Sequence, residues 1–243
     1  MHAKLRQPIV ALFALLAGCV GDPNASGDTS GDTPTPLPMQ INPADFVATV
    51  TNAYFPLLPG TTLIYSSTVD GQAEQVTVMV THDTKVILGV TCTVVHETLM
   101  HGLRLLEDNV HWYAQDKSGN VWFFGENLMK FENGQVTTDG SWEAGVDDAQ
   151  PGFIVKGHPQ VGDAYRQEFA SGIAEDHAEI LSLTESVTVP AGSFQNCLKT
   201  KDFSDLDPGV VQNKIFCPDV GQVLAVTVEG GQDREELMSI LHE

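Results

Sequence analysis

Alternation of apolar and polar residues is the feature that most constrains the fold of this chain. Val76, Val78 and Val80 share one face of an extended segment. The same spacing recurs in residues 90–97, 187–189 and 224–228. A period of two is typical of a β-strand, whose successive side chains point to opposite faces, and long helical periodicity is nearly absent. We therefore expect an all-β fold with at most a minor helical part.

Turn signals separate these segments. They are Asp70-Gly71, Ser118-Gly119-Asn120, Asn133-Gly134, Asp139-Gly140, Asp207-Pro208-Gly209 and Gly230-Gly231. Asn-Gly and Asp-Gly favour tight hairpins because these residues tolerate positive φ. We predict a strongly twisted antiparallel sheet that curls into an open or half-closed barrel. Residues 43–52 are expected to form one short helix, and residues 141–160 a long connection broken by glycine and proline.

The first 18 residues have the pattern of a targeting signal. A basic stretch with Lys4 and Arg6 precedes an apolar run over 9–16, which is too short to span a bilayer. Leu16-Ala17-Gly18-Cys19 follows, and this motif resembles the lipobox of bacterial lipoproteins. The resemblance implies that residues 1–18 are removed and that Cys19 is acylated. The alternative is an ordinary secretory signal with a chance cysteine.

The segment after Cys19 is predicted to be a tether. Residues 19–42 are rich in Gly, Pro, Ser, Thr and Asp and offer almost nothing to bury, so they cannot form a core. Two or three acyl chains, such as palmitate, make a stable membrane anchor. Val20 stands where an aspartate would retain a lipoprotein at the inner membrane, which implies the outer membrane of the cell envelope. Residues 43–243 then form a single β half-barrel domain.

The charge of the chain limits its partners. The formal net charge is −20, and loss of the leader leaves ten basic against 32 acidic side chains, a net charge of −22. Such a surface disfavours nucleic acid. The expected contact is with the membrane, through the N-terminal lipid. An apolar small molecule or another envelope protein is a further candidate partner, and no cofactor is expected.

Residues 112–126, WYAQDKSGNVWFFGE, carry the densest aromatic cluster. In an antiparallel hairpin these aromatic side chains fall on both faces, which a sheet with one buried face does not require. One interpretation is core and cross-strand packing. The other is a concave aromatic face that holds an apolar ligand through Trp112, Tyr113, Trp122 and Phe124.

The remaining cysteines predict a disulfide in an oxidising compartment. A turn centred near 204–209 places Cys197 and Cys217 nearly opposite each other on adjacent strands. This position favours the pair Cys197–Cys217. No neighbour that would stabilise a thiolate is visible, so a catalytic cysteine is not expected.

Four segments together resemble a largely uncharacterised family of bacterial lipoproteins. They are NAYFPLLPGTTLIY (52–65), WYAQDKSGNVWFFGE (112–126), VTVPAGSFQNCLKT (187–200) and FCPDVGQVL (216–224). The family's sheet is similar to the β half-barrel of the LolA/LolB carriers and of TapB-like lipoproteins. The resemblance implies a concave apolar face able to hold an acyl chain, although a fold does not fix a function. It also implies a disulfide between Cys92 and Cys197, because Cys217 stands where the family has a small residue.

Glu175, His177 and Glu179 form a polar cluster that alternation places on one strand face. Two carboxylates and an imidazole are ligands for a divalent ion, or an acid–base pair for hydrolysis. The alternative is a solvated start of a strand. We expect a binding or structural lipoprotein rather than an enzyme, with a cell-surface hydrolase using Glu175 and Glu179, or an assembly partner of another envelope protein, as alternatives.

Overall fold

The computed structural model describes residues 40–69 and 71–243. The predicted signal peptide, the lipidation site Cys19 and most of the tether lie outside the described residues. The described residues form one short 3-10 turn, η1 (Pro43–Asp45), and eighteen strands. The strands are β1 (Phe46–Val47), β2 (Val50–Asn52), β3 (Phe55–Leu57), β4 (Thr61–Val69), β5 (Gln72–Ile87), β6 (Val90–His101), β7 (Arg104–Asp116), β8 (Val121–Glu132), β9 (Gln135–Thr137), β10 (Trp142–Glu143), β11 (Gln150–Val155), β12 (Ala164–Arg166), β13 (Glu168–Phe169), β14 (Asp176–Val189), β15 (Gly192–Ser204), β16 (Val211–Cys217), β17 (Gly221–Glu229) and β18 (Arg234–His242).

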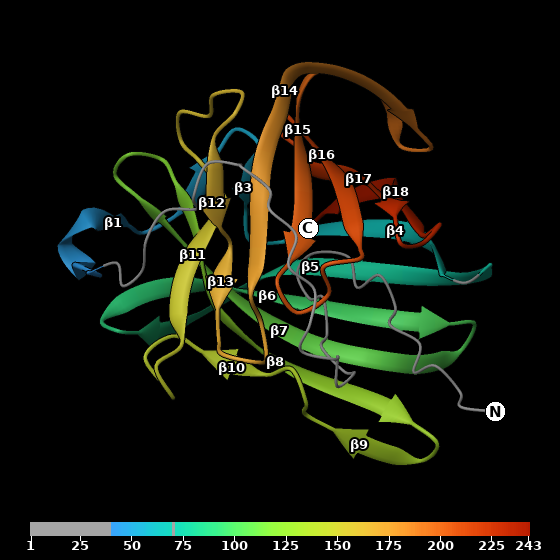
Figure 1. The fold of residues 1–243 in the computed structure, drawn as a ribbon, viewed down its shortest axis with the longest axis horizontal. Coiled ribbons are helices and arrows are strands. Elements are labelled where there is room, and N and C mark those ends of the chain that lie inside the picture. Colours follow the sequence, from blue (N-terminus) through green and yellow to red (C-terminus); the bar gives the residue numbers. More distant parts are fainter. Residues whose placement is uncertain (1–39, 70) are drawn as a thin grey trace, which may run out of the picture.

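Sixteen strands form one antiparallel sheet, which confirms the predicted fold class. Its order is β12-β14-β15-β16-β17-β18-β4-β5-β6-β7-β8-β11-β13, with β1 paired to β7 and with β9 and β10 paired to β8. In Figure 1, β5 to β8 run across the lower half while β14 to β16 run steeply above them, so the sheet is strongly twisted. In the part of the chain that the structure describes, no helix has the length and apolarity needed to cross a membrane.

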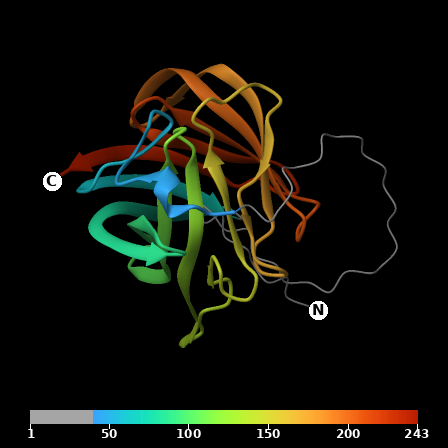
Figure 2. The same cartoon turned by 90° about the vertical axis from the view of Figure 1, so that its left-hand side faces the viewer.

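The two ends of the sheet meet through β12 and β13. Gln167 alone separates these strands; β12 pairs with β14 on one side, and β13 pairs with β11 on the other. The Gln167 amide donates to the Asp176 carbonyl at 2.8 Å, and the Tyr165 hydroxyl donates to the Ile154 carbonyl at 3.2 Å. The result is a nearly closed barrel with one seam, and Figure 2 shows the strands curving around a common interior. Pairing at the seam leaves few free edges.

The β2–β3 hairpin closes one end of the barrel. Gln115, near the end of β7, accepts hydrogen bonds from the amides of Thr51 and Asn52 at 2.7 and 2.8 Å. The Phe55 ring lies 5.5 Å from the ring of Tyr113, inside the barrel, in edge-to-face geometry. We call this the closed end. The turns of the β4–β5, β6–β7 and β8–β9 hairpins lie at the other ends of these strands, which we call the open end.

Two local expectations are wrong. The predicted helix over 43–52 is a single 3-10 turn followed by β1 and β2, because tertiary pairing with β7 and β3 overrides the local pattern. Residues 141–160 are not an irregular connection, since they contain β10 and β11, and β11 joins β8 to β13 in the sheet.

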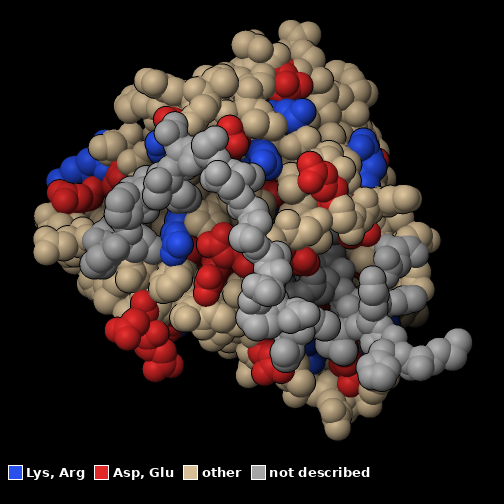
Figure 3. Space-filling view, viewed as in Figure 1, with Lys and Arg blue, Asp and Glu red and all other residues tan. Residues whose placement is uncertain are grey.

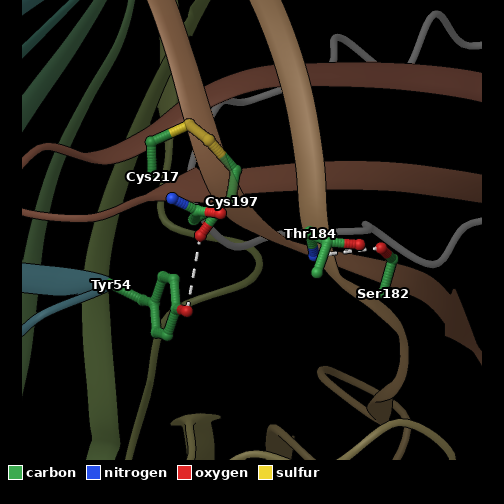
Figure 4. The surroundings of a disulfide bond; sticks show 6 residues. Tyr54, Ser182, Thr184, Cys197 and Cys217 are labelled. Carbon is green, nitrogen blue, oxygen red and sulfur yellow. Dashed lines mark hydrogen bonds between the residues drawn. A yellow bond between two sulfur atoms is a disulfide. The ribbon is translucent and has the colours of Figure 1, made fainter.

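The disulfide joins Cys197 of β15 to Cys217 of β16, with the two Cα atoms 4.3 Å apart (Figure 4). This is the pairing that the intervening turn favoured, whereas the pairing of Cys92 with Cys197 that the family resemblance implied is wrong. Cys92 is a free, buried thiol on β6. Beside the disulfide, the Tyr54 hydroxyl donates to the Asn196 carbonyl at 3.4 Å and holds the closed-end hairpin to β15.

A β-bulge at Gly125 changes which side chains β8 turns inward. Tyr113 pairs with Phe123 and His111 with Glu126, so Trp112 of β7 stands opposite two residues of β8, Phe124 and Gly125. The simple alternation placed Glu126 on the face of Trp122, but the bulge moves Glu126 to the inner face, beside His111. Gly125 has φ of 128°, and a Cβ there would overlap the Trp142 carbonyl oxygen and lie 2.9 Å from the Glu143 Cα atom.

We predict that Gly125→Ala destabilises the barrel by roughly 3 kcal/mol or more, from backbone strain plus overlap with β10. Gly134→Ala is the matched control, because Gly134 also has positive φ but would place its Cβ in open space. It should cost about 1–2 kcal/mol. Urea denaturation of both variants is the measurement, and equal losses would contradict a role for the bulge.

Candidate functional site

The inward face of β7 carries polar side chains. Glu107, Asn109, His111 and Tyr113 alternate along the strand, and each is at most 4% exposed. Because β7 runs from the open end to Gln115 at the closed end, these side chains form a row through the interior. Buried groups of this kind are costly unless they are paired or neutral, so they mark the interior as a candidate site.

His111 lies between two carboxylates at the centre of this row. Its Nε2 atom is 3.6 Å from Oε2 of Glu97, and its Nδ1 atom is 3.7 Å from Oε2 of Glu126. The Asn109 amide donates to Glu126 at 2.5 Å. Burial disfavours the imidazolium, but Glu97 and then Glu126 outweigh it, so the pKa of His111 is raised above its usual value. The two carboxylates therefore favour the charged imidazolium form of His111.

The pKa of Glu126 is raised to about 7, since burial favours its neutral form more than His111 and Asn109 favour the charged one. A carboxyl with this pKa exchanges its proton near neutral pH, which an exposed glutamate does not do.

A second buried group lies near the seam. The Lys214 ammonium is 3.1 Å from Oδ2 of Asp202, and both side chains are buried. Burial lowers the pKa of Lys214, but the nearby carboxyl groups of Asp202, Asp176 and Glu168 raise it by more. The net shift is upward, and it favours the charged form. The pKa of Glu168 is raised well above its usual range by burial and then by Asp176. One buried cation thus stands among several carboxyl groups, and burial shifts Glu168 toward its neutral form.

A third group joins β4, β17 and β18. The Gln222 side-chain amide donates to Glu235 at 3.0 Å, and the Tyr65 hydroxyl donates to the Gln222 carbonyl at 2.9 Å. Burial, and then the charge of Glu97, raises the pKa of Glu235 well above its usual range. Since Glu97 also faces His111, the interior groups act on one another electrostatically as one network.

A pocket of about 340 Å³ opens at the open end of the barrel. It is lined by Val69, Gln72, Glu74, His101, Arg104, Leu106, Glu107, Lys130, Phe131, Glu132 and Asn133. We call it the open-end pocket. Its volume falls in the range that small-molecule sites occupy.

Glu107 connects this pocket to the buried network. The side chain is only 4% exposed, lines the pocket, and its Oε2 atom has no hydrogen-bond partner among the described residues. Burial raises the pKa of Glu107 to about 8, although Lys130 opposes the shift. A buried carboxyl with unused hydrogen-bonding capacity at the end of a pocket is a candidate ligand-binding group.

The four predicted aromatic residues do not converge on one recess. Tyr113 faces the interior, stacked 5.0 Å from the Phe123 ring, while Trp112, Trp122 and Phe124 lie on the opposite face of β7 and β8. All four are at most 8% exposed, and none lines the open-end pocket.

Other side chains cover the outer aromatics. The ring of Phe46 lies 5.7 Å from Trp122 and 5.6 Å from Phe124, and the ammonium of Lys85 lies 3.4 Å above Trp112. Ligand binding by this set stays a prediction, and it requires the covering side chains to move.

The acidic cluster of the second half does not form a shared site. Glu175 accepts a hydrogen bond from the Gly172 amide at 2.9 Å, and His177 stacks on Phe203 and contacts Asp205 at 2.9 Å. Glu179 pairs in register with Lys201. Across residues 40–69 and 71–243, no three His, Cys, Asp or Glu side chains are placed to hold a metal ion. The geometry therefore gives no support to the metal or hydrolase alternative.

The interior network is not among the sites predicted from the sequence. Its signal is the alternating string Glu107-x-Asn109-x-His111-x-Tyr113, which looks like the solvated face of a strand. Only closure of the barrel turns that face inward.

The surface charges are mixed on the face drawn in Figure 3. Lys and Arg side chains are interspersed with Asp and Glu there, so the acidic residues, which give the chain its net charge of −20, form no separate patch on this face.

The fold and the site define an antiparallel β-barrel protein with an ionisable interior and a pocket at one end. No family model matches the chain, and no curated protein matches it.

Two solved structures resemble it. One is a protein from Bacteroides fragilis described as exported and as having a YmcC-like fold, with 16% identity. The other is a protein from Parabacteroides distasonis described as a lipoprotein, with 14% identity. Each match has a TM-score of 0.44 and covers 78% of this chain and 99% of the other. Similarity of this extent establishes no shared function, and the likeness to LolA/LolB or TapB-like proteins stays a prediction.

We predict that the barrel becomes less stable as the pH rises from 5 to 8. Glu107 and Glu126 have folded-state pKa values of about 8 and about 7, above the ordinary 4.5, so the folded chain holds more protons than the unfolded chain in this window. Raising the pH then favours unfolding, by up to about 1.4 kcal/mol per pH unit for each group. The raised pKa of His111 acts in the same direction.

Urea denaturation at unit pH steps is the measurement. Glu107→Gln should flatten the curve between pH 6 and 8, whereas Glu229→Gln, an exposed change on β17, should leave it unchanged. A wild-type stability that is constant or rises from pH 5 to 8 would contradict the buried-proton interpretation.

Proposed function

We propose that this chain is a lipid-anchored binding protein of the bacterial envelope, and that its barrel receives a small ligand in the open-end pocket. The observation that carries the binding role is Glu107, a buried carboxyl with an unpartnered oxygen at the inner side of a pocket of about 340 Å³. The lipobox Leu16–Cys19 and the tether support the anchor. Val20 supports the outer membrane as the destination.

A structural or assembly role is the alternative, and one observation favours it. Leu103, at the tip of the β6–β7 hairpin, is fully exposed. A large apolar side chain at a hairpin tip is a candidate contact for another envelope protein. A single exposed leucine is common on protein surfaces, however, whereas a buried, unpartnered carboxyl is not.

The anchor is tested by Cys19→Ala. The variant cannot be acylated, so we expect the chain to move from the membrane fraction to the soluble fraction of lysed cells. Wild type should sediment with outer membranes in a density gradient. Membrane association that survives Cys19→Ala would contradict lipid anchoring through this residue.

The pocket is tested by screening a library of small soluble fragments against the full-length chain by NMR. We expect chemical-shift changes confined to the pocket lining. Gln72→Trp should abolish them, because Gln72 lines the pocket and an indole there fills it. Gln75→Trp, an exposed change on the same strand but outside the lining, is the matched control. Fragment binding that persists in Gln72→Trp would place the site elsewhere.

A further inference from the structure

The open-end pocket combines one buried acid with an apolar wall. Glu107 lies at its inner side, and Val69, Leu106 and Phe131 contribute apolar surface. Neither Lys130 nor Arg104 forms an ion pair with Glu107 among the described residues; Arg104 instead donates to the Phe131 carbonyl at 3.2 Å. The Glu107 side chain therefore lines the pocket, and its buried Oε2 atom has no protein donor among the described residues.

The surrounding charges favour a positive ligand. Two further pocket residues, Glu74 and Glu132, are acidic, and Glu97 and Glu126 lie behind Glu107 in the interior. Arg104 and Lys130 line the same pocket and oppose this effect, so the three acids of the lining outnumber its two basic side chains by one. The net charge of −20 adds a long-range attraction for a cation. A bare metal ion lacks the required ligand set, because no three acidic, His or Cys side chains in residues 40–69 and 71–243 are placed to hold one.

We propose that the open-end pocket binds an organic cation, a protonated amine or guanidinium with a short apolar group, through the Glu107 carboxylate. The N–H groups of such a ligand donate charge-assisted hydrogen bonds to Glu107, and its apolar part packs on Leu106 and Phe131. This inference rests on the proposed role of the pocket as a ligand site and names its ligand class.

Binding of the cation is coupled to the release of a proton from Glu107. Burial raises the pKa of Glu107 to about 8, so the free pocket holds a neutral carboxylic acid at pH 7. The ligand keeps its own protons, and Glu107 releases one proton to solvent as the ion pair forms. Several other groups face Glu107 or line the same pocket. They are Glu74 on β5, Glu97 and His101 on β6, Arg104 on β7, and Glu126, Lys130 and Glu132 on β8.

The test is isothermal titration calorimetry of the full-length chain with three probes of matched shape: n-hexylammonium, hexan-1-ol and hexanoate. Butylguanidinium is a second cationic probe. We expect at least one of the two cations to bind at pH 7.5 roughly tenfold or more tightly than the alcohol or the acid. Glu107→Gln should lower affinity for that cation roughly tenfold or more and leave the weak binding of hexan-1-ol unchanged. Glu229→Gln, which removes one exposed charge outside the pocket, should alter neither.

Proton release gives a second measurement that needs no variant. Affinity for the cation should rise several-fold between pH 6.5 and 7.5 in wild type. Titrations in phosphate and in HEPES, two buffers that take up a proton with different enthalpies, should differ in heat by the amount expected for the release of up to one proton. Glu107→Gln should remove both effects.

Three outcomes would overturn the inference: equal binding of hexan-1-ol or hexanoate, unaltered cation affinity in Glu107→Gln, or failure of both cations to bind. If neutral fragments still shift the pocket residues and Gln72→Trp abolishes those shifts, only the cation inference fails. If no fragment binds there, the proposed binding function fails with it.

Discussion

The structure depends on how a nearly closed barrel accommodates ionisable side chains in its interior. Closure forces every second residue of each strand inward, and in this chain many of those residues are acids. An unpaired buried charge costs several kcal/mol, so each group needs a partner or a proton. Asp202 is paired with Lys214, Glu235 receives a hydrogen bond from Gln222, and burial shifts Glu168 toward its neutral form. Glu107 differs from these groups because its side chain lines the open-end pocket.

The two ends of the barrel differ: the closed end carries packing and the disulfide, and the open end carries the pocket. At the closed end the β2–β3 hairpin inserts Phe55 beside Tyr113 and Phe216, and the Cys197–Cys217 disulfide lies near the same end. A cross-link of this kind typically stabilises a fold by about 2–4 kcal/mol. This end supplies the apolar burial that allows polar groups elsewhere in the interior. At the open end, the strands finish in hairpin turns that surround a pocket.

The aromatic hairpin contributes to the fold on both of its faces. Tyr113 and Phe123 stack inside the barrel, while Trp122 contacts Phe46 and Phe153 on the outside. Such cross-strand and edge-to-face pairs are worth about 0.5–1.5 kcal/mol each beyond the area they bury. The rings over 112–126 therefore pack against covering segments outside the barrel and against one another inside it.

The sequence by itself determined the all-β class, the antiparallel hairpins and the anchor motif, because alternation, turn residues and the lipobox are local patterns. It left the disulfide open between Cys197–Cys217 and Cys92–Cys197, and the structure decided for the first pair. It also contained Glu107, Asn109 and His111 at alternate positions, but local spacing cannot tell an inward polar face from a solvated one. Tertiary structure decided that question. Pairing of β12 and β13 with opposite ends of the sheet closed the barrel, and the bulge at Gly125 turned Glu126 toward His111. Both events depend on which strands pair and in what register, which alternation does not encode, and burial of a carboxyl, with the rise in its pKa, exists only once those pairs form.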